Sequence, residues 1–215
     1  MLTKIAVRGV GRVGAAVARA ALEAGLAVNV AGSGAAEDIA LLAEIVIPGA
    51  TAMTAADAAA DADIVVLAVP LHKFRSVDPS ILEGRIVIDA MNHWAPIDGD
   101  LPEFSDPSVG TSEIVREHFV GARLVKALNH IGYHELEEHA RRDGGDRRAL
   151  AYASDDAEAS ASVHELIDRF GFDPINAGPL AAGIAFESAT TIFTSNLDAD
   201  GMRAALADAA PALAA

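Results

Sequence analysis

The stretch IAVRGVGRVGAAVARAALEAGL (residues 5–26), continued by AVNVAGSG (27–34), decides the fold. It joins a short apolar run, a turn with three glycines, an alanine-rich segment and a second apolar run. This order predicts a strand, a turn, a helix and a second strand within about thirty residues, the setting that a dinucleotide-binding glycine fingerprint requires. The stretch therefore predicts a dinucleotide site.

The three glycines, Gly9, Gly11 and Gly14, have the spacing G-x-G-x-x-G. In this motif the first glycine permits a tight turn, the second lets a pyrophosphate approach the backbone, and the third lets helix and sheet pack closely. The free N–H groups at the start of the helix, and its partial positive charge, then favour the phosphates.

The end of the second strand distinguishes NAD from NADP. An NAD site has Asp or Glu there, which binds the ribose 2′-hydroxyl, whereas this strand ends in AGSG (31–34). Glu37 and Asp38 come too late and are expected in the first turn of a helix. Ser33 and nearby backbone N–H groups can bond a 2′-phosphate, and Arg12 can add a guanidinium over the adenine or toward the phosphate. The sequence favours NADP, although no Arg or Lys directly follows Ser33.

Strands alternate with helices along most of the chain, which predicts an α/β fold with a doubly wound, mainly parallel sheet. The expected strands are KIAVRGV (4–10), LAVNVAGS (26–33), TAMT (51–54), DIVVLAVP (63–70), RIVIDAMN (85–92), ARLVKALN (122–129), RRALAYAS (147–154) and DPINAGP (173–179). The tail from residue 180 is predicted to be mostly helical and ends in the low-complexity segment ADAAPALAA (207–215). We therefore expect one domain with a short C-terminal helical extension.

Composition narrows the functional classes. Lys and Arg number 16 against 31 Asp and Glu, a formal net charge of −15, which argues against binding of nucleic acid or of an anionic membrane surface. The absence of cysteine excludes disulfides, thiolate metal sites and cysteine nucleophiles. No apolar run approaches the ~20 residues of a membrane span, and the first residues lack signal-peptide features, so a cytoplasmic protein is expected.

Ligands of open parallel sheets lie beyond the carboxyl ends of the strands. Val69 and Pro70 end one predicted strand, and we expect them to form a wall beside the nicotinamide. Asn92 and Asn129 each close another strand, where an amide can bond the nicotinamide carboxamide or the acceptor ring.

His93, His130, His134 and Tyr133 cluster around the same predicted strand ends. A single histidine in such a place is most often a surface or cap residue, but three with a tyrosine raise the expectation that one contacts substrate. These histidines follow no compact metal motif, so no metal is expected. Lys126 lies in mid-strand among apolar residues, and we expect an edge or interface lysine there rather than a catalytic one.

The segment HWAPIDGDLPEFSDPSVG (93–110) is rich in proline and glycine. It is predicted to be a loop, and long loops inside compact domains are often functional. The following segment TSEIVREHF (111–119) is predicted to open a helix with a capping box, with Thr111 or Ser112 as the cap.

Several stretches, in order, resemble the NADPH-dependent reductases of the deazaflavin coenzyme F-420. They are IAVRGVGRVG (5–14), ADIVVLAVP (62–70), GRIVIDAMN (84–92), ARLVKALN (122–129), YASDDAEA (152–159) and FGFDPINAGPL…FES (170–188). Because they span nearly the whole chain, the resemblance is far more specific than the glycine fingerprint alone. It implies a Rossmann-like NADP-binding domain over residues 1–179, with a small helical segment of the same domain over 180–215. It also implies a homodimer that transfers a hydride directly between NADP(H) and the deazaflavin ring, without metal.

The resemblance places NADP contacts on Val10, Gly11, Arg12, Val13, Ser33, Val69 and Met91. Together with the positions argued above, the predicted cofactor site comprises Gly9, Val10, Gly11, Arg12, Val13, Gly14, Ser33, Gly34, Val69, Pro70, Met91 and Asn92. The implied deazaflavin pocket falls on Asn129, His130, Ile131 and Gly132 and on the AGPL turn (177–180), with His93 as a further candidate.

The chain departs from the family pattern in two places. Ser33-Gly34 stands where many members have Ser-Arg, and MNHWAPIDG (91–99) stands where a shorter TNP-type ending is expected. Two alternatives therefore stay open: a related NADPH-dependent reductase of another flavin-like, quinone-like or carbonyl acceptor, and a non-catalytic NADP(H)-binding sensor. Hydroxyacid dehydrogenases of the 6-phosphogluconate type are rejected, because they need a long all-helical second domain for which too little chain remains.

Overall fold

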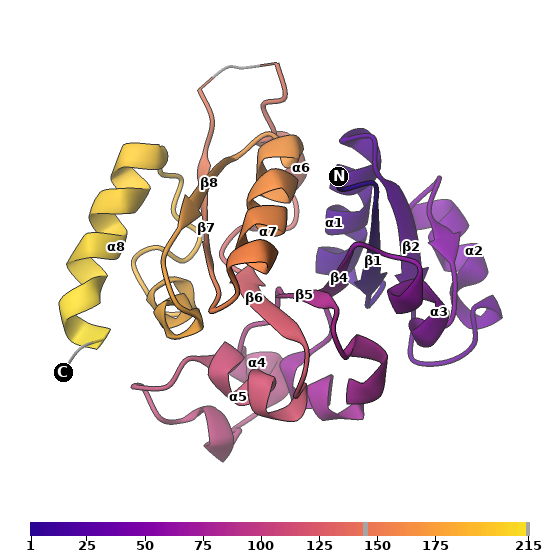
Figure 1. Cartoon of the computed structure of the whole chain (residues 1–215), viewed down its shortest axis with the longest axis horizontal. Helices are drawn as coiled ribbons and strands as arrows, with labels where there is room; N and C mark the ends of the chain where they lie inside the picture. Colours follow the sequence, from indigo (N-terminus) through magenta and orange to yellow (C-terminus); the bar gives the residue numbers. More distant parts are fainter. Residues whose placement is uncertain (144–145, 214–215) are drawn as a thin grey trace.

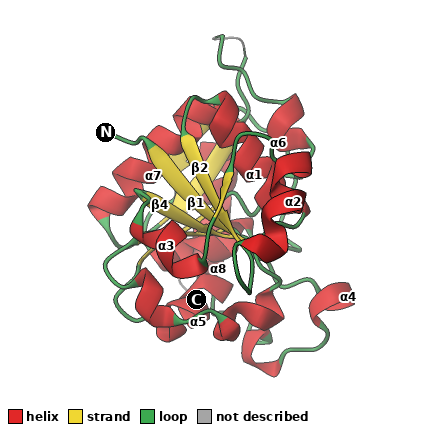
Figure 2. Ribbon diagram, turned by 90° about the vertical axis from the view of Figure 1, so that its right-hand side faces the viewer, coloured by secondary structure: helices red, strands yellow, loops and turns green. Residues whose placement is uncertain are grey.

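The computed structural model describes residues 1–143 and 146–213. Its centre is one eight-stranded sheet with the strand order β3-β2-β1-β4-β5-β6-β7-β8. Figures 1 and 2 show this sheet lying between helices on both faces. The predicted α/β class and the doubly wound, mainly parallel Rossmann-like sheet are confirmed.

The strands lie close to the predicted segments. They are β1 Lys4–Arg8, β2 Ala27–Ala31, β3 Thr51–Ala52, β4 Ile64–Leu67, β5 Ile86–Asp89, β6 Arg123–Ala127, β7 Ala149–Ala153 and β8 Asp173–Asn176. The α-helices are α1 Arg12–Glu23, α2 Glu37–Val46, α3 Ala55–Ala60, α4 Ala95–Asp98, α5 Thr111–His118, α6 Glu135–Glu138, α7 Ala157–Phe170 and α8 Ala199–Leu213. The described residues also contain four 3-10 helices: η1 Leu71–Ser76, η2 Pro79–Leu82, η3 Pro102–Phe104 and η4 Leu180–Phe186.

The first two strands and the helix between them form as the glycine-rich stretch predicts. β1 pairs in parallel with β2 on one side and with β4 on the other, so it lies in the middle of the sheet. Buried strands of this kind are apolar on both faces, and β1 and β4 are accordingly built from Ile, Val, Ala and Leu except at the ends of β1. Helix α1 covers β1 with a face made largely of alanine, which allows a close approach.

Two helical layers cover the sheet. One face carries α1, α2, α6 and α7, whose apolar side chains share a core with β1, β2 and β4. The other face carries α3, η1, η2 and α5 over the first half of the sheet, and η4 with α8 over β7 and β8. The helical connections between the strands therefore cover both faces of the sheet, as a doubly wound fold requires.

The direction of the chain reverses between β6 and β7. The pairs from β3 to β6 are all parallel, whereas β6 and β7 pair antiparallel through Lys126↔Ala153 and Ala127↔Tyr152. Beyond these pairs the Ala151 N–H donates to Nε2 of His130 at 3.1 Å. His130 therefore takes the place of a strand carbonyl where the ladder between the two strands stops.

Three local predictions need correction. The segment 93–110 is not one continuous loop, because it contains α4 and η3, each opened by a proline in its first turn. The cap of α5 is Gly110 rather than Thr111 or Ser112: the Gly110 N–H donates to the Glu113 carboxylate at 3.0 Å, which is half of a capping box. Lys126 is not at an edge, because β6 lies between β5 and β7 and its side chain is fully buried.

The C-terminal part packs onto the second half of the sheet. In Figure 1 its helix α8 lies beside β7 and β8, at the opposite end of the sheet from β1 and β2. Its contacts form a third apolar cluster around Phe186, Ile192 and Met202. The helical prediction for the tail is met by η4 and α8, while residues 214–215 of the low-complexity end lie outside the described residues. A domain boundary at residue 179 stays a prediction.

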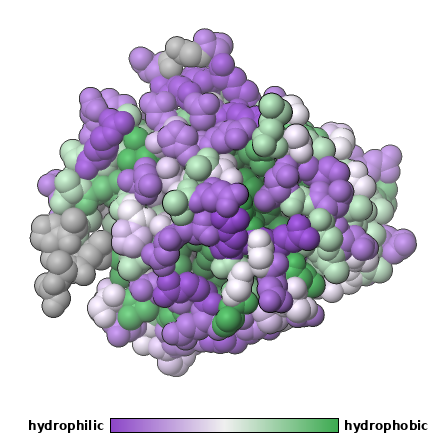
Figure 3. All heavy atoms as spheres, viewed as in Figure 1, coloured by the Kyte–Doolittle hydropathy of each residue, from purple (hydrophilic) through white to green (hydrophobic). Residues whose placement is uncertain are grey.

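One face of the surface is shown in Figure 3. Hydrophilic residues cover much of this face, with hydrophobic residues among them. Among the described residues, no helix has the length and apolar character needed to cross a membrane.

His130 should make stability depend on pH. Burial, with the nearby charges of Arg148 and Lys126, lowers the His130 pKa from 6.5 to about 3, so the imidazole stays neutral in the folded protein while it gains a proton in the unfolded chain. Stability from this group is complete above the unfolded pKa and falls as the pH decreases toward the folded pKa. Between about pH 7.5 and pH 5 we expect it to account for a loss of about 2 kcal/mol.

Urea unfolding of the wild type and of His130→Gln at both pH values measures this difference. The variant should lose about 2 kcal/mol less than the wild type over the interval, whatever its absolute stability. His134→Gln, which changes an exposed histidine, is the control and should follow the wild type. Parallel losses in wild type and His130→Gln would contradict a neutral buried imidazole.

Candidate functional site

A cleft of about 620 Å3 lies beyond the carboxyl ends of β1, β4 and β5. Its walls come from the turn after β1, from the segments that follow β4 and β5, and from one tyrosine after β6. The lining residues are Gly11, Arg12, Val13, Ala68, Val69, Pro70, Leu71, Ala90, Met91, Asn92, Trp94, Ile97, Asp98 and Tyr133. Most of this surface is apolar, with a guanidinium, a carboxylate, an amide and a phenol placed around it.

The glycines of the turn divide into two kinds. A Cβ on Gly14 would lie 1.9 Å from the carbonyl oxygen of Gly9, and a Cβ on Gly9 would lie 2.4 Å from the carbonyl oxygen of Ala68. These glycines are needed for close packing of β1, α1 and β4. A Cβ on Gly11 meets nothing within 4 Å, so this glycine leaves open space in the cleft wall where a pyrophosphate can approach the backbone.

The start of α1 offers an anion site to that open space. Gly11 is the N-cap, no side chain caps the first turn, and no acidic residue lies in it. The first N–H groups of a helix have no partner within it, and the helix dipole adds partial positive charge. A phosphate beside Gly11 therefore meets donors and positive potential together.

Arg12 and Tyr133 stand between the cleft and a second hollow. The second hollow has about 360 Å3 and shares Gly11, Arg12 and Tyr133 with the cleft. The Arg12 guanidinium lies over the Tyr133 ring at 5.7 Å from its centroid, and Arg12 Nη1 lies 3.5 Å from the tyrosine oxygen. This pair links the turn after β1 to the segment after β6 across the open side of the sheet.

The outer lip of the cleft is held by Asp98 of α4. Its carboxylate accepts the Trp94 N–H at 2.8 Å and contacts Nδ1 of His72 in η1 at 2.7 Å. Burial raises the Asp98 pKa, but the hydrogen bonds from His72 and from the Trp94 N–H outweigh it, so that the pKa lies below its ordinary value. The carboxylate therefore fixes α4, with the exposed side chains of Trp94 and Ile97, against η1 on the far side of the cleft.

Two asparagines join the ends of β5 and β6. Asn92 Nδ2 donates to the Asn129 carbonyl at 2.6 Å, and Asn129 Nδ2 donates to Asn92 Oδ1 at 3.1 Å and to the Phe186 carbonyl at 3.0 Å. Asn92 lines the cleft, whereas Asn129 is buried behind it. The structure thus brings the two predicted amides together, with Asn129 as the support for Asn92.

The backbone beside this amide pair has an unusual conformation. Leu128 has a φ of 62°, in the left-handed region that costs a residue with a side chain about 1–3 kcal/mol. It directly precedes Asn129, so the turn at the end of β6 is held by its surroundings. Strained backbone of this kind clusters at functional sites.

A buried ion pair lies beneath Met91. Lys126 Nζ donates to the Met91 carbonyl at 2.6 Å and lies 3.4 Å from Asp89 Oδ2. The Asp89 carboxylate also accepts the Met91 N–H at 2.9 Å and the Ser112 hydroxyl at 2.5 Å. Lys126 and Asp89 are both fully buried, and through these bonds they hold the Met91 backbone from both sides. The lysine is thus a positioning residue for the cleft wall.

The predicted cofactor residues differ in whether they line the cleft, pack beneath it or lie apart from it. Gly11, Arg12, Val13, Val69, Pro70, Met91 and Asn92 line the cleft, and Val10 lines the adjoining hollow. Gly9 and Gly14 serve the packing beneath it. Ser33 and Gly34 lie exposed in the turn after β2, apart from the described cleft.

The predicted acceptor residues are mostly not at the cleft surface. His130 is buried, with Phe186 at 5.0 Å between ring centroids, and Ile131 is also buried. The Gly132 N–H donates to Glu135 at 2.9 Å, and His93 contacts the Gly99 carbonyl at 3.1 Å. His134 is exposed beside Tyr133, at 4.1 Å between ring centroids. Of His93, His130, His134 and Tyr133, only Tyr133 lines the cleft.

Sequence reasoning missed the lip residues Ile97, Asp98 and His72. Ile97 and Asp98 lie in a segment predicted as loop, and the proline at the start of α4 was the signal that a helical turn begins there. His72 meets Asp98 across 26 positions of sequence, a pairing that no local pattern indicates. Among residues 1–143 and 146–213, no group of three or more His, Asp or Glu side chains is placed to hold a metal ion.

The comparisons with known proteins support the class of NADP-dependent oxidoreductases. Residues 4–93 match the family of NADP oxidoreductases described as coenzyme F-420-dependent. This segment covers β1 to β5 with the glycine turn and the Met91 wall, and the family resemblance found in the sequence is confirmed there.

Two solved structures extend the similarity beyond that segment. A protein of Sinorhizobium meliloti without an assigned function is 28% identical, with 92% of this chain and 96% of that one covered and a TM-score of 0.76. A protein of Arthrobacter sp. FB24, described provisionally as an F-420-dependent NADP-reductase, is 27% identical, with 85% and 88% covered and a TM-score of 0.69.

More distant structures share the fold. A reductive aminase from Aspergillus terreus in complex with NADPH and ethyl levulinate is 20% identical, with a TM-score of 0.59. The match covers all of this chain and 66% of the aminase. Among curated proteins, none matches the chain by sequence.

Replacing Gly11 and Gly14 by alanine should separate binding from folding. Gly11→Ala has room for its Cβ and an extended backbone, so stability should stay within about 0.5 kcal/mol, while NADPH affinity falls roughly tenfold to a hundredfold through the clash with the pyrophosphate. Gly14→Ala should cost about 1–3 kcal/mol or more of stability. Urea unfolding and NADPH titration by fluorescence measure both. Unchanged NADPH affinity in Gly11→Ala would remove the pyrophosphate from this turn.

Lys126→Met should destabilise the protein strongly. It leaves the buried Asp89 carboxylate without its cation, which typically costs about 3–5 kcal/mol. The double variant Lys126→Met/Asp89→Asn removes the uncompensated charge and should recover part of this loss. Chemical unfolding of wild type, both single variants and the double variant gives the coupling energy. A purely additive double variant would show that the two side chains do not interact.

Proposed function

We propose that this protein transfers a hydride between NADP(H) and the deazaflavin coenzyme F-420. The observation that carries the proposal is the cleft itself: an apolar slot beside the open glycine turn, wide enough at about 620 Å3 for flat rings. Sites of 300–1,000 Å3 with few polar groups are typical for cofactors and small ligands. The family described for residues 4–93 supplies the two coenzymes.

The N-terminal half of the cleft fits the dinucleotide. Gly11 and the first N–H groups of α1 bind the pyrophosphate. The nicotinamide ring then lies against the apolar wall of Val69, Pro70 and Met91. Asn92, held by Asn129, presents its side chain to this wall and bonds the nicotinamide carboxamide. Each of these residues binds or orients, and none needs to change its protonation state.

The second coenzyme fits between the lip residues Trp94 and Ile97 and the Tyr133 ring. Bound together, the two coenzymes supply the chemistry, a hydride passing between nicotinamide C4 and deazaflavin C5. The protein contributes a fixed geometry, because stacking of two rings at reacting distance lowers the entropic part of the barrier. The apolar lining excludes water from the reacting atoms.

The assembly and the location are proposed on different grounds. A homodimer is implied by the resemblance to the F-420-dependent reductases and is proposed on that basis, and the cytoplasmic location expected from the sequence is proposed with it. The Arthrobacter protein of similar length, provisionally described as an F-420-dependent NADP-reductase, supports the choice of acceptor.

An anaerobic mixture of protein, NADPH and oxidised F-420 tests the reaction. The absorbance of the oxidised deazaflavin should fall with NADPH and at least about tenfold more slowly with NADH, because a charge-assisted contact discriminates by that factor. With NADPH deuterated at the transferred C4 position, mass spectrometry should find one deuterium in the reduced deazaflavin. Gly11→Ala is the matched variant that folds but should lose the reaction at low NADPH.

The outcomes separate the alternatives. Bleaching without deuterium would replace direct transfer by an indirect route. NADPH binding without bleaching of F-420, but with reduction of a flavin, quinone or carbonyl compound, would identify another acceptor. NADPH binding with no oxidation by any of these acceptors would make the protein a sensor.

A further inference from the structure

Arg8, the last residue of β1, lacks a partner. Its Nε is buried and makes no hydrogen bond, and among the described residues no carboxylate forms an ion pair with its guanidinium. The side chain is half-buried, and this burial lowers the Arg8 pKa below its ordinary value. A cation that is partly removed from water without an anion to pair with is costly, and an anionic ligand would offset that cost.

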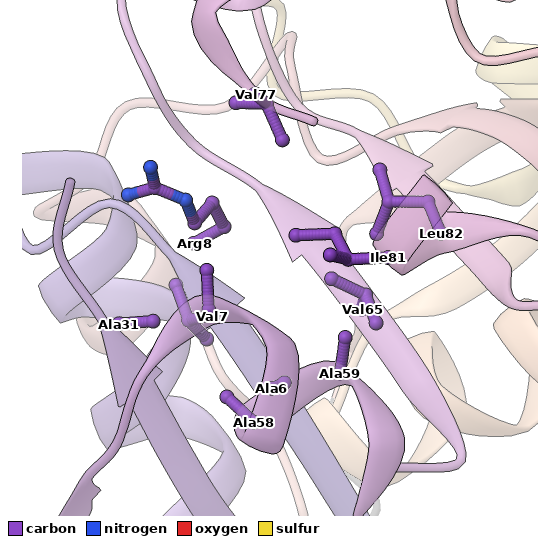
Figure 4. Close-up of a pocket in the computed structure, with 11 residues that line it drawn as sticks. Ala6, Val7, Arg8, Ala31, Ala58, Ala59, Val65, Val77, Ile81 and Leu82 are labelled. Carbon is purple, nitrogen blue, oxygen red and sulfur yellow. The ribbon is translucent and has the colours of Figure 1, made fainter. Parts of the chain in front are cut away.

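The surroundings explain where the guanidinium lies. Arg8 is one of the residues that line a small apolar hollow, together with Ala31, Ala58, Val77 and Ile81, and this hollow has only about 10 Å3 of free space. The hollow itself therefore holds no ligand. Figure 4 shows the Arg8 guanidinium turned away from Ala6, Ala58 and Ala59.

The position of Arg8 in the sheet relates it to the adenosine side of the site. Arg8 pairs with Ala31, the last residue of β2, and the next N–H, of Gly9, donates to the Ala31 carbonyl at 2.9 Å. Ser33 follows two positions later. In a dinucleotide whose pyrophosphate lies at the glycine turn, the ribose 2′ position lies at the end of the second strand. The end of β1 at Arg8 therefore lies beside the end of β2, where the ribose 2′ position is expected.

The turn after β2 has a shortage of positive charge. No Lys or Arg occurs in residues 32–46, and the Asp38 carboxylate folds back to accept the Ala35 N–H at 2.9 Å. The other nearby arginines are engaged elsewhere: Arg12 with Tyr133, and Arg19 with Glu137 and the Val46 carbonyl. A dianionic phosphate at this turn needs a cation, and among the described residues the Arg8 guanidinium at the neighbouring strand end has no carboxylate partner.

We propose that Arg8 and Ser33 together form the subsite for the 2′-phosphate of the dinucleotide, with the cation supplied from β1 instead of from the turn after β2. This inference rests on the proposed function only for the dinucleotide, not for the acceptor. A guanidinium is suited to the task, because its fork of donors matches phosphate oxygens. The same contact favours NADP over NAD, because NAD has no 2′-phosphate and leaves the half-buried Arg8 guanidinium unpaired.

Fragments of the cofactor test the subsite directly. The dissociation constants of adenosine 2′,5′-bisphosphate and of 5′-AMP are measured by calorimetry for the wild type, Arg8→Gln and Arg8→Lys. For Arg8→Gln we expect binding of the 2′-phosphorylated fragment to weaken at least about tenfold, while 5′-AMP changes less than about twofold. Arg8→Lys keeps a charge without the fork and should fall between. Arg116→Gln, which removes an exposed arginine of α5 paired with Asp155, is the matched control and should leave both constants unchanged.

Each outcome either supports or overturns the proposed 2′-phosphate subsite. Equal weakening of both fragments in Arg8→Gln would mean that the guanidinium serves the adenine or the fold, and would overturn the subsite. Unchanged binding of both fragments would overturn it as well, as would a wild type that binds 5′-AMP as tightly as the bisphosphate. Selective loss of the bisphosphate supports the subsite even where F-420 is not reduced, because that result removes the proposed acceptor and leaves the dinucleotide site standing. Unfolding curves confirm that each variant is folded.

Discussion

The close approach of α1 to β1 is the constraint on which the rest of the site depends. The third glycine of the turn faces the carbonyl of the first at a distance that no side chain would allow, so the helix begins directly at the edge of the sheet. This seating aims the free N–H groups of the helix across the carboxyl ends of β1 and β4. The middle glycine, Gly11, can then leave space for a ligand, because Gly9 and Gly14 make the close packing contacts. Ligand binding and chain packing are thus divided among three adjacent positions.

The opposite wall of the cleft is fixed by polar groups in the interior in addition to the apolar packing of Met91. A lysine and an aspartate from adjacent strands hold the Met91 backbone, and Asn129 holds Asn92. Buried polar groups are stabilising only when each has its partners, and here the partners come from β5, β6, α5 and η4. A ligand therefore meets a wall whose shape is set before it binds, which reduces the ordering cost of binding.

The sequence predicts what depends on local pattern and misses what depends on distant partners. Alternating strands and helices and the glycine turn follow from periodicity and spacing, and the structure shows each. Val69 and Pro70 were expected from the end of their strand and Met91 from the family resemblance, and all three line the cleft. His130 followed the same reasoning, yet it is buried, because the reversal of β7 gives its ring nitrogen a backbone donor. Lys126 resembled an edge residue since its partner Asp89 lies 37 positions away. Polar residues at strand ends can face the ligand or support the wall, and only the tertiary contacts decide between them.

The two edges of the sheet determine how copies of the protein can meet. Exposed edge strands tend to pair with other chains and so promote aggregation. Here β3, at one edge, has only 2 residues, and β8, at the other, contains Pro174, which cannot donate to a ladder. Helix α8 also packs beside β8. Continuation of the sheet from one molecule into the next is disfavoured at both ends, so association between copies depends on side-chain surfaces of the helical layers, and the strands remain protected during folding and at high concentration.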